Sequence, residues 1–274
     1  MGRVSLPRCF GVLGDPVAHS RSPAMHTAAF AALGLPHRYL AFHVDAAGLA
    51  AAVAGARALG FGGLNVTVPH KQAALALCDE LSPAARRIGA VNTIAFAEGG
   101  ISGDNTDAPG FAAAVRELGG EVDEAIVLGG GGAARAVIDA LVHDLRARRI
   151  RWVSRAPEDL PGRDRVEILN YAGLAAGRLD ADLLVHCTTV GMRHGPAALP
   201  VRLALDGLRA GARVVDVVYP RPAGGLLDRA EALGFAVQDG LPMLLWQGVR
   251  ALERWLGRPL PAAAVAAMRA ALRG

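Results

Sequence analysis

A run of four glycines lies between a short apolar segment and a longer one, and it constrains the fold of this chain more than any other stretch. The segment 124–128 has the length and apolar content of a buried strand, and 133–145 has the length and pattern of a helix. Residues 129–134, between the two, fit the pattern G-x-G-x-x-G/A. Such glycines let the backbone approach a pyrophosphate, and the following helix N-terminus offers free N–H groups to the anion. The sequence therefore predicts a dinucleotide-binding site at this loop.

Strand-like and helix-like segments alternate along the whole chain. Strands are expected at 10–13, 38–44, 63–68, 90–96, 101–103, 149–154, 183–186, 214–218 and 235–237. Helices are expected at 22–34, 45–60, 108–118 and from 243 onward, with a break at 257–261. Ser22 and Ser82, each followed by proline, are expected to cap helices, as is Asp45, and Gly99-Gly100 predicts a hairpin turn. This alternation predicts an α/β fold with largely parallel sheets covered by helices on both faces.

Composition disfavours several classes of function. The net charge of +4 is spread without a basic stripe, which disfavours nucleic-acid binding. The three cysteines Cys9, Cys78 and Cys187 lie far apart and match no metal-ligand spacing, so we expect free thiols, no metal and a reducing cytoplasm. No apolar run approaches the roughly 18 residues of a membrane span. The expected partners are therefore small molecules, with no nucleic acid and no membrane.

The strand after the glycine loop bears on the choice of dinucleotide. It ends at Ser154 and Arg155, where NAD-specific folds usually place an acidic residue on the ribose 2′-hydroxyl. An arginine suits a 2′-phosphate, so NADP is favoured over NAD. Glu158 and Asp159 follow closely and are an alternative pair of ribose ligands, which leaves NAD open.

Lys71 is the one lysine among the 29 Lys and Arg residues. Arginine stays protonated at any usable pH and cannot transfer protons, whereas burial or charged neighbours can bring a lysine pKa towards neutrality. Lys71 is therefore a candidate acid or base, although an arginine-biased composition with one lysine left over explains the count equally well. Ser20 and Ser22 lie at a predicted helix N-terminus, where two hydroxyls and free N–H groups would seat a carboxylate.

Six motifs together resemble one family. In order along the chain they are 14–23, 65–71, 88–93, 103–107, the glycine loop and 240–247. The chain resembles the shikimate dehydrogenases over essentially its whole length. The resemblance implies reversible NADP-dependent reduction of 3-dehydroshikimate to shikimate, within the chorismate pathway to the aromatic amino acids. It also implies two domains: a substrate domain of 1–107 plus 243–274, and a Rossmann-type, doubly wound NADP-binding domain of 108–242.

The resemblance further implies a role for individual residues. Lys71 and Asp107 would be the catalytic pair. Substrate would be bound by Ser20, Ser22, Thr67, Asn92, Tyr219 and Gln247. The cofactor site would be lined by Gly129, Gly130, Gly131, Gly132, Ala133, Ser154, Arg155, Thr188 and Gly240. Asn65 would shape its loop.

One departure and several alternatives stay open. The family usually reads Asn-Ala-Thr where this chain has His186, Cys187 and Thr188. A packed histidine replacing the amide is the expectation, and altered loop hydrogen bonding or cofactor affinity is the alternative. A quinate/shikimate dehydrogenase that also uses NAD is a close alternative. The methylenetetrahydrofolate dehydrogenase group should lack the Ser20/Ser22 motif, and a non-catalytic shikimate sensor should have lost Lys71 or Asp107. The sequence does not give the oligomeric state, and a homodimer is one option.

Overall fold

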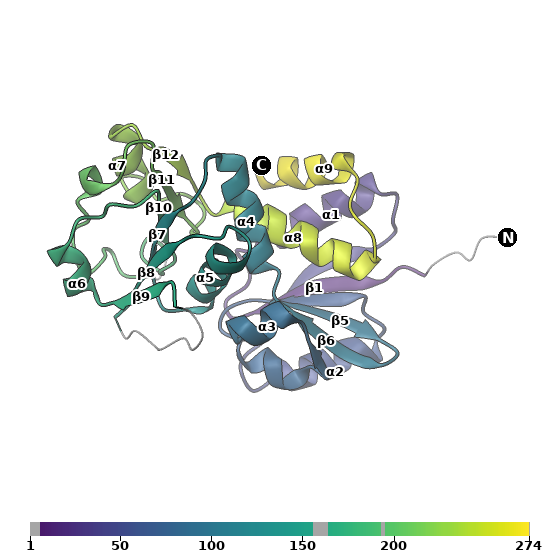
Figure 1. Ribbon diagram of the computed structural model, residues 1–274. Coiled ribbons are helices and arrows are strands. Elements are labelled where there is room, and N and C mark those ends of the chain that lie inside the picture. Colours follow the sequence, from purple (N-terminus) through teal and green to yellow (C-terminus); the bar gives the residue numbers. More distant parts are fainter. Residues whose placement is uncertain (1–5, 156–163, 193–194, 274) are drawn as a thin grey trace. The chain divides into compact units, whose positions relative to one another are not determined.

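Two compact units make up the chain (Figure 1). The computed structural model describes residues 6–155, 164–192 and 195–273, so Glu158 and Asp159 lie outside the described residues. The first unit comprises Met1–Thr106 and Leu244–Gly274, and the second comprises Asp107–Met243. The boundaries expected from the sequence lie one residue away at each junction.

The first unit contains a mixed sheet with the strand order β2-β1-β3-β5-β6-β4. Its strands are β1 (Cys9–Gly14), β2 (Arg38–His43), β3 (Gly63–Val66), β4 (Glu80–Leu81), β5 (Thr93–Ala97) and β6 (Gly100–Asp104). β1 runs parallel to both neighbours, whereas β5 runs antiparallel to β3 and β6. The expected hairpin at Gly99-Gly100 is present. It also makes this sheet less parallel than predicted, because a tight turn can only join antiparallel strands.

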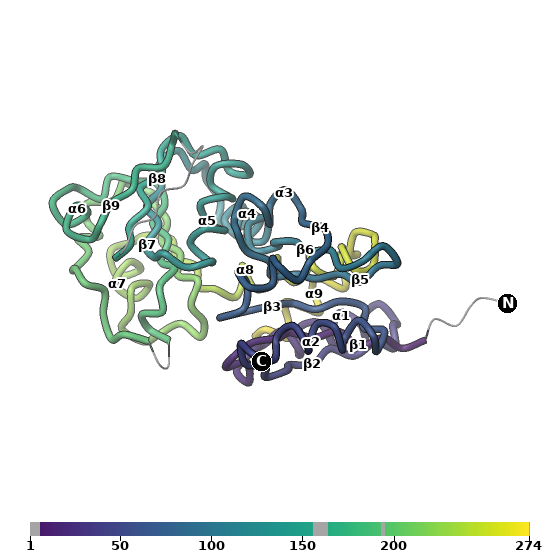
Figure 2. The backbone as a smooth tube through the Cα atoms, turned by 90° about the horizontal axis from the view of Figure 1, so that it is seen from below, coloured from purple at the N-terminus to yellow at the C-terminus, as the bar shows by residue number. Residues whose placement is uncertain are grey.

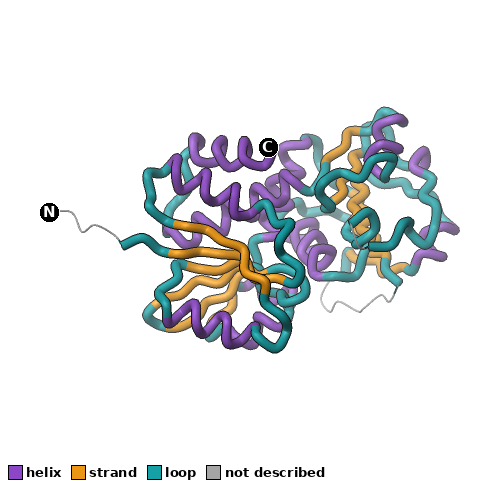
Figure 3. Tube along the Cα trace, turned by 180° about the vertical axis from the view of Figure 1, so that it is seen from behind, coloured by secondary structure: helices purple, strands orange, loops and turns teal. Residues whose placement is uncertain are grey.

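Helices cover both faces of this sheet (Figures 2 and 3). One face carries α1 (Ser22–Ala32), α8 (Leu241–Leu256) and α9 (Ala262–Arg273), and the other carries α2 (Leu49–Ala58), η1 (Ala73–Leu77) and α3 (Pro83–Ile88). Alternation along β1 supplies both cores, with Phe10 and Val12 packed on the α1 side and Leu13 on the α2 side. None of the described helices combines the length and the apolar content that crossing a membrane requires.

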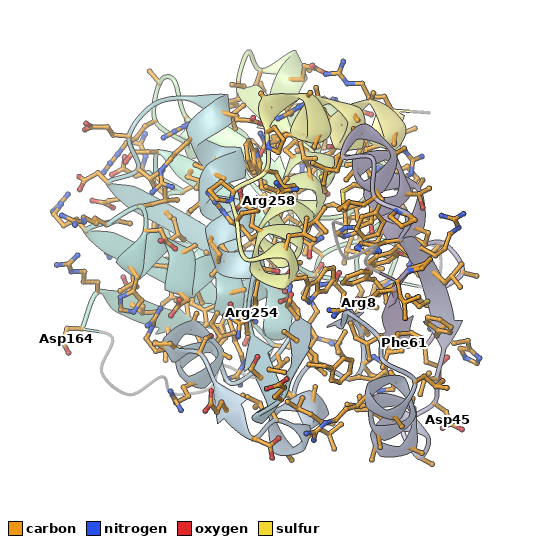
Figure 4. The ribbon with its side chains drawn as sticks, turned by 90° about the vertical axis from the view of Figure 1, so that its right-hand side faces the viewer. Arg8, Asp45, Phe61, Asp164, Arg254 and Arg258 are labelled. Carbon is orange, nitrogen blue, oxygen red and sulfur yellow. The ribbon has the colours of Figure 1, made fainter. Side chains whose placement is uncertain are left out.

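Two side chains of α8 fasten this helix to the sheet, and Figure 4 labels one of them, Arg254. Arg254 lies with Nη1 3.1 Å from Asp104 Oδ2 and donates through Nη2 to Ser102 Oγ at 3.1 Å. The indole N–H of Trp255 donates to the carbonyl of Ile94 at 2.9 Å. A C-terminal segment is thereby held on strands that lie some 150 residues earlier in the chain.

The second unit contains a fully parallel sheet with the order β12-β11-β10-β7-β8-β9. Its strands are β7 (Glu124–Leu128), β8 (Arg149–Val153), β9 (Val166–Leu169), β10 (Leu183–His186), β11 (Arg213–Asp216) and β12 (Ala236–Gln238). Counted from β7, this is the doubly wound order 3-2-1-4-5-6, which reverses between β7 and β10. The predicted α/β class with a Rossmann-type unit is confirmed.

Helices also cover both faces of the second sheet (Figure 1). On one face, α5 (Gly132–His143) packs on β7 and β8, beside α4 (Asp107–Leu118). On the other face, α6 (Tyr171–Ala176) and α7 (Leu226–Ala232) share one core, and η2 (Leu205–Gly207) contributes to it. The sequence did not predict β4, β9, α6, α7 or the two 3-10 turns, because these short segments have neither a periodicity nor the continuous apolar run of a buried strand.

The expected helix caps differ in outcome. Ser82 caps α3 as predicted, with its Oγ accepting from the N–H of Ala85 at 3.1 Å. The prediction was wrong at Ser22, which lies inside α1 behind an N-cap at Arg21. The backbone at Arg21 is helical rather than extended, and it is the Oγ of Ser20 that accepts from the N–H of Ser22, at 3.3 Å. Asp45 likewise precedes the N-cap of α2 and accepts from the N–H of Gly48 at 2.7 Å.

His26 on α1 is fully buried against the ring of Tyr39, with ring centroids 4.2 Å apart and planes inclined by 7°. Neither ring nitrogen of His26 has a hydrogen-bond partner among the described residues. Burial lowers the pKa of His26 from 6.5 to about 3, because a charged imidazolium would lose its hydration there. The native protein therefore holds this ring neutral under mildly acidic conditions.

We predict that His26→Phe makes the protein less sensitive to acid. Below the ordinary pKa the unfolded chain binds a proton at His26 that the native state does not, so stability is lost as the pH falls from about 6.5 towards about 3. From about pH 7 to about pH 5, the wild type should lose about 2 kcal/mol of unfolding free energy that the variant keeps. Urea denaturation at both pH values measures the difference.

Phe30→Leu is the matched control, because Phe30 lies in the same core and does not titrate. It should lower the unfolding free energy by the same amount at both pH values. Equal acid sensitivity of His26→Phe and the wild type would contradict the prediction.

Candidate active site

One edge of the first sheet gathers the motifs that the sequence singled out. The strands β1, β3 and β6 end at this edge, and the antiparallel β5 begins there. The register pairs Asn65 with Thr93, and Thr93 with Asp104. The loops that follow these strand ends therefore lie side by side although they are far apart in the sequence. Ser20, Thr67 and Lys71 lie in these loops, Ser22 is the first residue of α1, and Asn92 directly precedes β5.

The loop after β1 lies directly on the loop after β3. A Cβ at Gly14 would come within 2.5 Å of Thr67 Cγ2, so only glycine fits beneath that side chain. The N–H of Asp15 donates to the carbonyl of Val68 at 3.0 Å. These contacts place the predicted carboxylate seat beside the segment that carries Thr67 and Lys71.

Ser20 and Ser22 lie together at the start of α1. Ser22 is buried and Ser20 is half-buried. The hydrogen bond between them turns the hydroxyl of Ser20 towards the first turn of the helix, where free N–H groups point outward. Both serines lie at the helix N-terminus as expected, although the capping pattern differs from the prediction, and their role as a carboxylate seat stays a prediction.

Gln247 lies on α8, which packs against α1. A Cβ at the next residue, Gly248, would come within 2.3 Å of Met25 Cε, so the two helices touch at this point. Gln247 is buried, and its Nε2 donates to the carbonyl of Leu244 at 2.8 Å. Gln247 and Ser22 therefore lie on adjacent helices of the same unit.

Asn92 is held by a buried polar network. Its Oδ1 accepts from the N–H of Thr106 at 2.8 Å and from Thr93 Oγ1 at 3.0 Å. Asn65 donates to the carbonyl of Asn92 at 3.1 Å and accepts from the hydroxyl of Tyr39 at 2.7 Å. Asn65 therefore shapes this region from within the sheet, and the network fixes the orientation of the Asn92 carboxamide.

The two predicted catalytic residues adjoin this network. The carbonyl of Lys71 accepts from the N–H of Val91 at 2.8 Å, next to Asn92, and the Lys71 side chain is half-buried. Asp107, which is only 6% exposed, directly follows Thr106 and begins α4. Lys71 belongs to the first unit and Asp107 is the first residue of the second.

In the second unit, the glycine loop lies where the strand order reverses. Gly129 directly follows β7 and has a φ of +126°, which side chains rarely adopt. A Cβ there would come within 2.7 Å of the carbonyl oxygen of Cys187, which follows the neighbouring β10. Gly129 therefore allows two strand ends to approach at the position where doubly wound folds bind their ligands.

The described residues around this loop suit a dinucleotide. Gly131 caps α5 without a side chain, and a Cβ at either Gly131 or Gly132 would meet open space. Gly130 faces Ser154, with 3.3 Å from an added Cβ to Ser154 Cβ. The buried Oγ of Ser154 has no hydrogen-bond partner among the described residues, and Arg155 beside it is exposed. An unpaired buried hydroxyl costs about 1–3 kcal/mol, so a ligand atom that pairs with Ser154 Oγ would be stabilised there.

Gly240 and Tyr219 also lie in the second unit, beyond β12 and β11. A Cβ at Gly240 would come within 2.2 Å of the carbonyl oxygen of Val217 and 3.1 Å of Tyr219 Cδ1. Packing thus accounts for this glycine by itself, and its cofactor role stays a prediction. Tyr219 is the one predicted substrate ligand placed outside the first unit. The described residues contain no cluster of three or more His, Cys, Asp or Glu side chains suited to a metal ion.

Comparison with known proteins agrees with this arrangement. A model of the shikimate dehydrogenase substrate binding domain matches residues 12–94, and one of the shikimate 5'-dehydrogenase C-terminal domain matches residues 240–273. The shikimate dehydrogenase (NADP(+)) of Rubrobacter xylanophilus is 46% identical over 279 residues, covering 96% of this chain and 95% of that protein. The chain belongs to the shikimate dehydrogenase family.

Solved members of the shikimate dehydrogenase family share the fold. The enzyme of Thermus thermophilus, in complex with NADP(H) and shikimate, matches with a TM-score of 0.83 and 40% identity over 97% of this chain and 98% of that chain. The enzyme of Listeria monocytogenes, in complex with shikimate and NAD, matches with a TM-score of 0.80 and 31% identity over 97% and 98% of the two chains. The family resemblance inferred from the motifs is confirmed.

Sequence reasoning missed Asp216 and misjudged His186. His186 lies with Nδ1 2.9 Å from Asp216 Oδ1 and Nε2 2.5 Å from Thr188 Oγ1. The ring is therefore hydrogen-bonded on both sides rather than merely packed where shikimate dehydrogenases usually have an amide. The usable signal was that His186 and Asp216 each end a buried apolar strand, so that in a parallel sheet they can lie side by side.

We predict that Ser154→Ala has opposite effects on stability and on binding. The variant removes a buried hydroxyl without a partner, so the ligand-free protein should gain about 1 kcal/mol of unfolding free energy. If that hydroxyl meets a dinucleotide, the Kd for NADPH should rise about three- to tenfold. Urea denaturation and fluorescence titration measure the two quantities.

Ser82→Ala serves as the control of the same chemical change. It removes the cap of α3, so the unfolding free energy should fall by about 1 kcal/mol while the Kd for NADPH stays the same. An unchanged NADPH affinity in Ser154→Ala would contradict the assignment of Ser154.

Proposed function

We propose that the protein is an NADP-dependent shikimate dehydrogenase that reversibly reduces 3-dehydroshikimate to shikimate. The observation that carries the proposal is the gathering of two serines at a helix N-terminus, an oriented carboxamide and the single lysine at one edge of the first sheet. Shikimate carries a carboxylate and three ring hydroxyls, and these groups match that set of donors. Family membership and the Thermus enzyme's bound NADP(H) and shikimate support the same reaction.

The proposed substrate ligands fall into two groups, according to the part of the substrate that they bind. Ser20 and Ser22, with the N–H groups at the start of α1, bind the carboxylate, and Tyr219 assists them. Thr67, Asn92 and Gln247 hydrogen-bond the ring hydroxyls or the carboxylate.

The cofactor ligands follow the carboxyl edge of the second sheet. The backbone of the glycine loop and the N-terminus of α5 bind the pyrophosphate, and Ser154 and Arg155 hold the ribose 2′-phosphate. Thr188 and Gly240 line the remainder of the site. NADPH supplies the hydride that converts the ketone into an alcohol.

Lys71 and Asp107 handle the proton. A ketone that accepts a hydride leaves an alkoxide, which the ammonium of Lys71 stabilises by a hydrogen bond and then protonates. In the reverse direction the neutral amine takes the proton from the hydroxyl. Asp107 orients the amine and opposes the loss of its charge on desolvation.

A four-way steady-state assay tests the proposed function. Shikimate and quinate are each offered with NADP and with NAD, and reduced nicotinamide is followed by absorbance. The highest kcat/KM is expected for shikimate with NADP. Preference for quinate or NAD would support the broader dehydrogenase instead, and failure of all four pairs would refute the enzymatic function.

Lys71→Arg should abolish most turnover while keeping the fold. The guanidinium keeps the positive charge and hydrogen bonds but does not release a proton, so kcat should fall about 10²–10⁴-fold. The KM for shikimate and the Kd for NADPH should change far less. Steady-state kinetics and thermal unfolding measure both, and a near-native kcat would contradict the role given to this lysine.

Arg155→Ser should weaken the discrimination between the two cofactors. Loss of the guanidinium removes a charge-assisted contact to the 2′-phosphate, which is worth about 1.5–3 kcal/mol, so the KM for NADP should rise at least tenfold. The KM for NAD, which has no phosphate there, should stay within about twofold. Equal changes in both KM values would argue against contact with the phosphate.

Two further expectations accompany this function. A homodimer is the proposed alternative to a monomer, and light scattering of the purified protein distinguishes the two.

A cytoplasmic location remains the expectation from the unpaired cysteines.

A further inference from the structure

A chain of three polar side chains crosses two strand ends of the second unit. His186 ends β10 and Asp216 ends β11, and the register places the two residues side by side. The residues are only 2% and 3% exposed. Thr188 lies two positions after His186, and its hydroxyl meets the far side of the imidazole.

The hydrogen bonds of this chain fix the direction of each group. A carboxylate oxygen only accepts, so His186 Nδ1 carries a hydrogen and donates it to Asp216 Oδ1, which also accepts from the N–H of Val218 at 3.0 Å. On the other side of the ring, Nε2 lies 2.5 Å from Thr188 Oγ1, and that oxygen accepts from the N–H of Val190 at 3.1 Å. Two partners thereby hold the Thr188 hydroxyl in one orientation.

This hydroxyl lies at the point where the strand order reverses. His186 pairs in register with Leu128, the last residue of β7, and the following Gly129 packs on the carbonyl of Cys187. Thr188 is therefore one residue beyond the closest contact between the glycine loop and β10. Ligands of doubly wound sheets bind at this reversal.

Packing alone does not require a histidine and a carboxylate here. Taking such a pair out of water is costly, and replacing it by apolar side chains of similar volume is often neutral or stabilising. We propose that His186, held by Asp216, is a positioning residue that fixes the Thr188 hydroxyl for the bound cofactor, and that this link sets the affinity for NADPH. The inference rests on the proposed function in one respect, which is that Thr188 contacts the cofactor.

Two amide variants of His186 test its contact with Asp216 and its contact with Thr188 one at a time. The amide nitrogen of asparagine replaces Nδ1, so His186→Asn keeps the contact with Asp216 and loses the contact with Thr188. The amide oxygen of glutamine replaces Nε2 as the acceptor of the Thr188 hydroxyl, so His186→Gln keeps a partner for Thr188. Each variant retains a polar group near one neighbour, and thermal unfolding establishes that it folds.

The experiment is a fluorescence titration with NADPH, combined with steady-state kinetics. His186→Asn should raise the Kd for NADPH and the KM for NADP about two- to tenfold, with kcat and the KM for shikimate within about twofold of the wild type. His186→Gln should restore the Kd to within about twofold. A purely structural histidine would lower thermal stability without this split between the two substrates.

A double-mutant cycle with Thr188→Val decides whether His186 acts through Thr188. Thr188→Val alone should weaken NADPH binding, and adding His186→Asn to it should produce no further change. An equal effect of His186→Asn in both backgrounds, or an unchanged Kd in either single variant, would overturn the inference. The four-way assay of the wild type tests the dehydrogenase function separately, so the two failures are distinguishable.

Discussion

Close approach of the backbone at the ends of central strands is the constraint on which both candidate binding edges depend. In the first unit Gly14 lies beneath Thr67, and in the second Gly129 lies against the carbonyl of Cys187. A Cβ at Gly129 would come within 2.7 Å of backbone and push two strand ends apart, and a Cβ at Gly14 would come within 2.5 Å of Thr67 and displace its side chain. Parallel strands bring their carboxyl ends to one edge, and the glycines let the loops at that edge touch.

Buried polar networks complete each edge in a different way. In the first unit, Tyr39 and Asn65 support Asn92 from inside the sheet, so a ligand would meet an amide whose orientation is already fixed. In the second unit, Asp216 and His186 support Thr188 from the neighbouring strand. Preorganised donors and acceptors lose little entropy on binding, which is the physical advantage of holding them by such bonds.

The predictability of each element followed its apolar content and burial more closely than its length. The strand at 124–128 and the strand at 183–186 were predicted with their observed bounds, because each is a continuous apolar run between polar or glycine-rich neighbours. The strand β9 was missed although it is as long as the strand at 183–186, because Glu167 interrupts its apolar run and none of its residues is fully buried. The hairpin at Gly99-Gly100 was predicted, but its consequence, an antiparallel insertion into the first sheet, depends on which strands pair.

The sequence by itself determined the family, the residue types at each edge and the single lysine, because motifs and residue counts can be read without knowing how the chain folds. Only the tertiary structure decided that Ser20 rather than Ser22 accepts at the start of α1, and that His186 links Asp216 to Thr188. The physical reason is that capping depends on the backbone angles at Arg21, and that a hydrogen bond between β10 and β11 depends on the register of strands about 30 residues apart. Neither the backbone angles at Arg21 nor the register of β10 and β11 can be read from the order of the residues, because both are set when the chain folds.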